Sequence, residues 1–149
     1  MISRERVSYI IPIAVSDDTF GTPVLVYEVE NWEGKADLAF GIFFIGLRSN
    51  KNYVVGVKIA SEDDSIVLIP LESDEFANKK AFRVSEASDG ELIVSASLKV
   101  NFEGVKVEQP GIYEAQAVLI DVDTKEILSI NSSFFDIKPA GMIRDEFRK

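Results

Sequence analysis

Apolar and polar residues alternate with a period of two along most of the chain, which is the period of a β-strand. The clearest case covers residues 112–122, where the alternate positions Tyr113, Ala115, Ala117 and Leu119 are apolar or small. Pro110 and Gly111 precede this segment; proline presets one turn dihedral and glycine permits the next. We therefore expect Pro110, Gly111 and Tyr113 to serve the architecture, as the entry to a strand deep in an all-β fold.

Other segments that alternate in this way or are rich in apolar and β-branched residues, bounded by turns rich in Gly, Asn, Asp and Ser, predict the remaining strands. They are residues 7–15, 24–30, 35–48, 53–60, 66–70, 91–102 and 127–137, and residues 81–86 can also be extended. Pro12 lacks a backbone donor, so the first segment is expected to be an edge or bulged strand.

Two pairs of neighbouring segments predict hairpins. One joins residues 35–48 to residues 53–60, and the other joins residues 112–122 to residues 127–137. Residues 35–48 are apolar on both faces, which predicts a central strand buried on two sides or one that passes between sheets, with Gly41 and Gly46 marking a bulge or a close backbone approach.

About eight strands without a long amphipathic helix predict an all-β, antiparallel, two-sheet β-sandwich, with a barrel as the alternative. The length of 149 residues suits one domain. We place this domain at residues 1–137 and a tail or short helix at residues 138–149. A helical turn capped by Ser73 could also form within residues 72–77.

The composition excludes several kinds of chemistry. The chain has neither cysteine nor histidine, so disulfides, thiolate metal sites and catalytic triads based on either residue are absent. Catalysis would have to depend on groups such as paired carboxylates, whose spatial separation the sequence does not fix. We therefore expect no enzymatic activity and no cofactor.

Net charge is −9, and the body of the chain is more acidic than its ends. No basic stripe is available to release counterions from phosphate, which argues against nucleic acid and anionic membranes as partners. The longest apolar run, residues 39–47, is too short for a membrane-spanning helix. The first fifteen residues faintly resemble a signal peptide, but Pro12 interrupts them, so the expected location is cytoplasmic.

The segment from Leu98 to Ile137 resembles the second half of immunoglobulin-like sandwiches. The order Pro110-Gly111-Ile112-Tyr113 resembles the bend into strand F, where the hydroxyl of a tyrosine corner bonds back to the bend. Ala115 stands where antibody-type domains have a cysteine, so the likeness is to the cysteine-free immunoglobulin-like domains of bacteria and phages, which also end in a Phe-x-Ile segment such as residues 135–137. This resemblance implies a fold and assigns no site.

Trp32, with Glu30 and Glu33 beside it, is a candidate contact for a sugar ring or a protein partner, and the competing interpretation is a tryptophan folded over the core. Glu62, Asp63 and Asp64 offer hard oxygen ligands for calcium, but without the spacing of an EF-hand. Asp121 and Asp123 fall where a hairpin turn requires Asp.

These observations predict a non-catalytic protein-interaction module, for example a phage or bacterial accessory protein or inhibitor, whose partner is an unidentified protein. One alternative is a carbohydrate- or calcium-binding sandwich, and another is an acidic decoy of a nucleic-acid-binding enzyme. The candidate edge strands also predict a homodimer formed through a sheet edge.

Overall fold

The computed structural model describes residues 4–15, 21–30, 32–71, 79–84 and 93–141. Within these residues the chain forms nine β-strands and no helix, and so no helix that could cross a membrane. The strands are β1 (Arg6–Pro12), β2 (Val26–Val29), β3 (Lys35–Arg48), β4 (Lys51–Ser61), β5 (Val67–Ile69), β6 (Lys79–Val84), β7 (Ile93–Lys106), β8 (Gly111–Asp121) and β9 (Ile127–Pro139). The predicted all-β class is confirmed, with nine strands in place of about eight.

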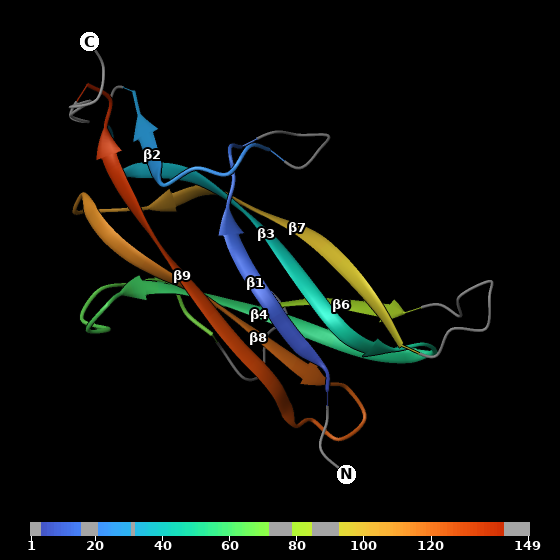
Figure 1. Cartoon of the computed structure of the whole chain (residues 1–149). Coiled ribbons are helices and arrows are strands. Elements are labelled where there is room, and N and C mark those ends of the chain that lie inside the picture. Colours follow the sequence, from blue (N-terminus) through green and yellow to red (C-terminus); the bar gives the residue numbers. More distant parts are fainter. Residues whose placement is uncertain (1–3, 16–20, 31, 72–78, 85–92, 142–149) are drawn as a thin grey trace.

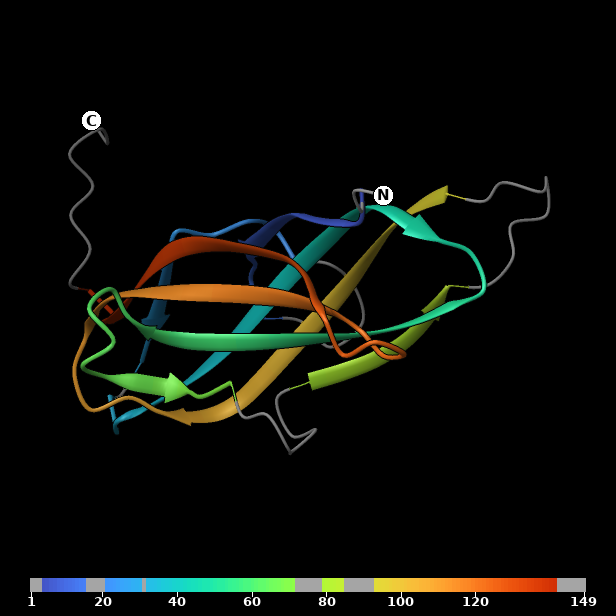
Figure 2. The ribbon, with the colours of Figure 1, turned by 90° about the horizontal axis from the view of Figure 1, so that it is seen from below.

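The strands form two sheets that pack face to face as a β-sandwich. The smaller sheet has the order β1-β3-β7, and the larger has the order β2-β9-β8-β4-β5, with β6 also paired to β4. Figure 2 shows β3 and β7 crossing the strands of the larger sheet at an angle. The predicted central position of β3 is confirmed, because it pairs with β1 on one side and β7 on the other.

The first predicted hairpin is wrong. β3 and β4 follow one another in sequence but lie in different sheets, and the chain crosses between them at Ser49 and Asn50. Asn50 adopts a φ of 61° and its N–H bonds to the carbonyl of Val84. Both strands have more extensive pairing elsewhere, β3 with β7 and β4 with β8, so each joins a different sheet. The second predicted hairpin, β8 with β9, is confirmed.

One strand pair departs from the expected antiparallel arrangement. β2 runs parallel to β9, from Val26 beside Asp136 to Val29 beside Pro139. The N-terminal part of the chain therefore contributes β1 to one sheet and β2 to the other (Figure 1). With β1, β3 and β7 facing β4, β8 and β9, the strand order resembles the immunoglobulin arrangement in which A, B and E face C, F and G.

Side chains that point inward from both sheets form one core. The largest fully buried ones include Tyr53, Tyr113, Phe40, Leu38 and Leu119. Aromatic rings also meet edge to face at one end, where Phe135 lies 5.4 Å from Phe40 and 5.6 Å from Tyr27 between ring centroids. Burial of this apolar surface is the main source of stability for such a sandwich.

Gly46 is required where the start of the described chain crosses β3. It has a φ of 74°, and a Cβ there would lie 2.3 Å from the carbonyl oxygen of Arg4. The pairing register of β3 with β7 shifts at this point, so the predicted bulge at Gly46 is confirmed, whereas Gly41 keeps regular pairing. β1 is an edge strand as predicted, but its bulge lies between Val7 and Tyr9, away from Pro12.

The predicted boundary at residue 137 needs a small correction, because β9 extends to Pro139. Lys138 and Pro139 pair with β2 and so belong to the sandwich. The predicted C-terminal helix and the predicted helical turn at Ser73 lie outside the described residues.

Candidate functional site

Trp32 lies in the connection between β2 and β3 and packs, half-buried, against the core. Glu30 and Glu33 are exposed beside it. This arrangement matches the competing interpretation, in which the indole covers one end of the sandwich. A side chain that contributes to the core in this way offers less of its ring face to a ligand.

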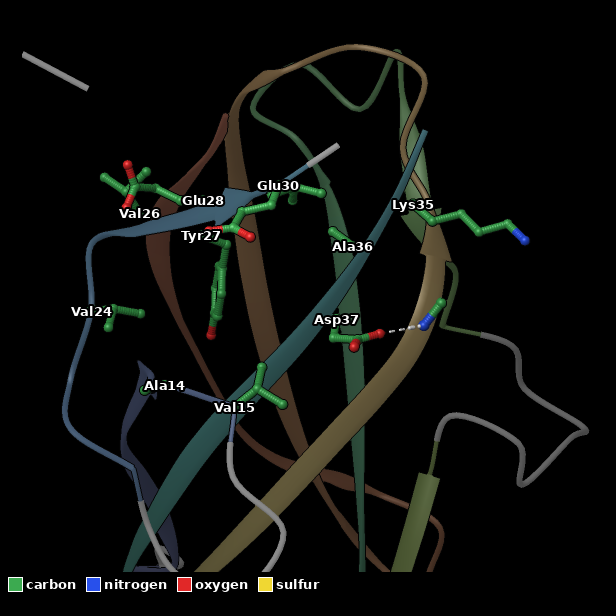
Figure 3. Close-up of a pocket in the computed structure, with 12 residues that line it drawn as sticks. Ala14, Val15, Val24, Val26, Tyr27, Glu28, Glu30, Lys35, Ala36 and Asp37 are labelled. Atoms are coloured by element: carbon green, nitrogen blue, oxygen red, sulfur yellow. Dashed lines mark hydrogen bonds between the residues drawn. The ribbon is translucent and has the colours of Figure 1, made fainter. Parts of the chain in front are cut away.

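A cleft of about 610 Å³ opens between β2 and the beginning of β3, next to the Trp32 connection. Figure 3 shows Tyr27 pointing into it and Lys35 pointing away. The Tyr27 hydroxyl bonds the carbonyl of Ile13 at 3.0 Å, and burial raises the pKa of Tyr27 to about 12, so this phenol stays neutral. Asp37 accepts a hydrogen bond from the Gly104 N–H at 2.8 Å. The cleft therefore has mainly apolar walls, and its best-placed polar groups already bond the backbone.

The three predicted calcium ligands do not form a metal site. Asp63 accepts hydrogen bonds from Ser61 and from the N–H and hydroxyl of Ser65, and these bonds lower its pKa to about 2. Asp64 pairs with Lys58 at 3.0 Å. In the described part of the chain, no group of three or more such side chains is placed to hold a metal ion. Asp63 therefore stabilises a turn.

Tyr113 occupies the position that a tyrosine corner requires. Its ring is buried and its hydroxyl donates a hydrogen bond of 2.5 Å to the carbonyl oxygen of Gln109, in the bend before β8. Gly111, between them, has a φ of 150° and no atom within contact distance of its missing Cβ. Pro110 and Gly111 thus shape the bend, and Tyr113 fixes it to the strand.

Within the described residues, a group of buried charged side chains lies between the sheets, and the sequence did not predict it. Glu5 and Asp121 are 3% and 6% exposed, and the ammonium of Lys51 lies between them, 3.1 Å from Glu5 Oε2 and 2.9 Å from Asp121 Oδ2. The hydroxyl of Tyr53 also donates to Glu5 Oε2 and accepts from the N–H of Arg48 at 2.9 Å. We call these four side chains, Glu5, Lys51, Tyr53 and Asp121, the charged cluster.

The electrostatics of the charged cluster favour the ionised forms of Lys51 and Asp121. Desolvation by itself would lower the pKa of Lys51, but its hydrogen bonds to Asp121 and Glu5 outweigh this effect and the pKa is raised. Desolvation would raise the pKa of Asp121, but Lys51 and the N–H groups of Asp123 and Thr124 outweigh it and the pKa is lowered. Burial and the bond to Glu5 raise the pKa of Tyr53.

The charged cluster joins the start of β1 to β4 and to the end of β8. Each charge faces an opposite charge and is hydrogen-bonded, as buried charges require. The bonds of these side chains to one another and to the backbone connect separate strands, which is a structural role. In the sequence, Asp121 is recognisable only as a turn residue, because nothing local to Glu5 or Lys51 signals their burial.

The outer face of the larger sheet carries an exposed apolar surface. Ile112 on β8 is 63% exposed, and Ile130 and Phe134 on β9 are 51% and 50% exposed. We call these three side chains the β8–β9 patch. Ile112 and Phe134 lie diagonally across the strand pair, because Phe134 is opposite Glu114 and Ile112 is opposite Asp136. Elsewhere on the same sheet Leu71 lies over Gly56 and the neighbouring Val118 is 1% exposed, so this face is covered there and exposed at the three side chains of the patch.

Comparison with known proteins gives a fold and no family. No protein-family model matches the chain, and no curated protein matches it. Among solved structures, two β-glucuronidases from Bacteroides uniformis are similar to it, one of them covalently bound to a cyclophellitol-6-carboxylate aziridine, with TM-scores of 0.53 and 0.54 and identities of 9% and 8%. A structural-genomics target, SoR45, aligns over 100% of this chain and 97% of its own, with a TM-score of 0.42 and 9% identity.

The glucuronidase alignments cover 89% of this chain but only 14% of those chains. The chain therefore spans a small, domain-sized part of their length. At this identity the likeness shows that the chain has a β-sandwich fold and shows nothing of its activity.

Proposed function

We propose that the protein is a non-catalytic binding module that contacts a protein partner through the β8–β9 patch. The observation that carries the proposal is the exposure of three large apolar side chains, Ile112, Ile130 and Phe134, on two adjacent strands of one sheet face. Single exposed apolar residues are ordinary on a protein surface, whereas a group on one rigid face is typical of an interaction site.

The surroundings of the patch are consistent with a protein interface. Ser132 bonds Glu114 at 2.9 Å between the apolar side chains, and Lys138 pairs with Asp136 at 3.2 Å next to them. Protein interfaces combine apolar contacts with hydrogen-bonding groups in this way. Because the chain carries a net charge of −9, a partner that presents apolar and basic side chains is favoured.

We propose a non-catalytic role because the buried ionisable side chains are already bonded within the fold. The chain has no cysteine or histidine, and the buried carboxylates Glu5 and Asp121 are both ion-paired with Lys51. The cleft beside Tyr27 holds a phenol that stays neutral at physiological pH. These groups stabilise the fold. The exposed apolar surface therefore supports binding as the function.

Affinity purification from the source cell tests the proposal. The bait proteins are the wild type, an Ile112→Asp/Phe134→Asp variant, and a matched control, Ile45→Asp, which changes an equally exposed residue on the other sheet. The proposal requires a protein that is enriched with the wild type and the control and is lost with the patch variant, while all three unfold at similar temperatures. Equal recovery with the patch variant, or turnover of a substrate by the purified chain, would contradict it.

A further inference from the structure

β7 is the longest edge strand of the sandwich. It contains 14 residues, and within the described residues it pairs only with β3. Other edges are short: β2 has four residues, β5 three and β6 six. Its pairing with β3 shifts register near both ends, between Val94 and Ala96 and between Phe102 and Val105, so the regular part of this edge runs from Ala96 to Phe102. Such an edge offers unpaired backbone groups to another strand, which natural proteins usually prevent.

The opposite edge of the same sheet is protected. On β1, the N–H of Val7 donates to the Ser129 hydroxyl at 3.0 Å, and Asn131 donates to the carbonyls of Val7 and Ser8 at 3.2 and 2.8 Å. Side chains of β9 therefore satisfy the backbone of β1 and close this side of the sandwich. On β7, no hydrogen bond of the described residues covers the outward backbone groups of Asn101.

The direction of the backbone groups on β7 follows from its partner strand. Ala39 on β3 accepts from the Ile13 N–H at 3.0 Å and donates to the Tyr27 hydroxyl at 3.3 Å, so its polar groups face away from β7. Ala39 is opposite Asn101, which makes this a non-hydrogen-bonded pair. The N–H and C=O of Asn101 therefore point toward the edge, as do those of Ser97 by alternation. The register shifts after Phe102, but the N–H of Gly104 bonds Asp37 on β3, so the preceding C=O of Glu103 points to the edge as well.

The inward side of β7 is incompletely covered. Leu98, Val100 and Phe102 are only half-buried, although their partners Ile42, Phe40 and Leu38 are fully buried. A groove of about 400 Å³ lies along this edge, between β7 and β6, and reaches the core residues Val55 and Val57. Apolar side chains that sit beside an open edge gain burial if another strand is added there.

We propose that β7 pairs with β7 of a second copy of this chain, antiparallel and about a twofold axis at Asn101. In this register Asn101 faces Asn101 of the other copy and exchanges two backbone hydrogen bonds with it. Val100 of each copy faces Phe102 of the other, above the groove. The two smaller sheets thereby become one continuous sheet across the dimer.

The sequence of β7 is self-complementary in this register. A twofold axis at Asn101 places Lys99 opposite Glu103, and it does so twice, because a symmetric interface repeats each contact. Neighbouring registers are disfavoured, since an axis at Lys99 or at Glu103 places like charges opposite one another. An ammonium has three donors, so Lys99 can serve this carboxylate in addition to contacts within its own chain. This agreement of charge and register favours a second copy over an unrelated strand.

Sedimentation equilibrium of the whole chain tests the proposal. The wild type is expected to form a dimer of twice 16.5 kDa as its concentration rises from about 1 to about 300 µM. Asn101→Pro removes an N–H that points to the edge and no bond to β3, so it should give a monomer that melts at the temperature of the dilute, monomeric wild type. A wild type that stays monomeric throughout, whether or not it binds a foreign extended peptide, would overturn the proposal.

A charge exchange tests the register without altering the backbone. Lys99→Glu or Glu103→Lys alone should weaken the dimer about tenfold, because each creates two like-charge pairs, and the double variant should restore wild-type affinity. Glu108→Lys, outside the pairing, is the matched control and should leave affinity unchanged. Single variants that dimerise as well as the wild type, or a double variant that is not restored, would show that this register is wrong.

Discussion

Lys51 and Asp121 form an ion pair of 2.9 Å between two adjacent strands of the larger sheet, at the end where the β8–β9 hairpin turns. Lys51 is 22% exposed in its side chain and Asp121 is 8% exposed, so the pair lies at the margin of the core. The same ammonium holds Glu5 at 3.1 Å. One lysine thus bonds two buried carboxylates and joins the start of β1 to the opposite sheet.

Lys51→Met should destabilise the protein strongly. The substitution leaves Glu5 and Asp121 buried without a cation, and removing one partner of a buried ion pair costs about 3 kcal/mol or more. Lys58→Met is the matched control, because Lys58 pairs with Asp64 at an exposed position where the cost is about 0–1 kcal/mol. Chemical denaturation measures both free energies of unfolding, and equal losses would contradict a structural role for the charged cluster.

The charged cluster also predicts the pH range of stability. The lowered pKa of Asp121 contributes stability above the unfolded-state pKa of about 3.9, which is lost as pH falls below it. The raised pKa of Lys51 contributes stability below about 10.4, which is lost as pH rises through the folded-state pKa, and the raised pKa of Tyr53 acts in the same direction. Melting temperatures should therefore be level between these limits and fall outside them.

Comparison with Lys51→Met isolates the contribution of the cluster to this profile. The variant should lose less stability than the wild type when the pH falls below about 4, since Asp121 no longer has the ammonium that lowers its pKa. Parallel profiles for the wild type and the variant would contradict the assignment.

Tyr113→Phe should cost about 1 kcal/mol of stability, because the Gln109 carbonyl loses its hydrogen bond while the ring stays in the core. Partner binding should be unchanged. Denaturation and binding are measured on the same samples, and a variant that keeps its stability but loses binding would make this bend a site and not a structural element.

Trp32→Ala should cost about 2 kcal/mol, since the indole is half-buried against the core. Glu33→Gln, at the exposed position next to it, should change neither stability nor binding. A Trp32→Ala variant with wild-type stability and no partner binding would restore the prediction that Trp32 is a contact residue.

The sequence was most informative where structure is local. The alternation in β8, the turn before it and the hairpin to β9 depend on neighbouring residues, and all three could be predicted. The partners of β3 and β4 could not be predicted, because β3 pairs most extensively with β7 and β4 with β8, both of which are distant in sequence. The parallel contact of β2 with β9 has the same origin.

The candidate site was less predictable than the fold. Trp32 and Asp63 are residue types typical of binding sites. In the structure, however, Trp32 packs against the core and Asp63 stabilises a turn, and neither environment can be read from the sequence. Glu5 is the opposite case. Its sequence position between two arginines predicts an exposed side chain, but the structure buries it. Its burial depends on Lys51 and Tyr53, which are 46 and 48 residues away.

Site-specific photo-crosslinking tests the proposed binding surface most directly. A photoreactive phenylalanine replaces Phe134 in the β8–β9 patch or, as the matched control, Tyr9 on the exposed face of the other sheet. Irradiation in the source cell should join a partner protein to the chain at position 134, and Ile112→Asp should abolish this product. A product at position 9 with none at position 134 would contradict the account.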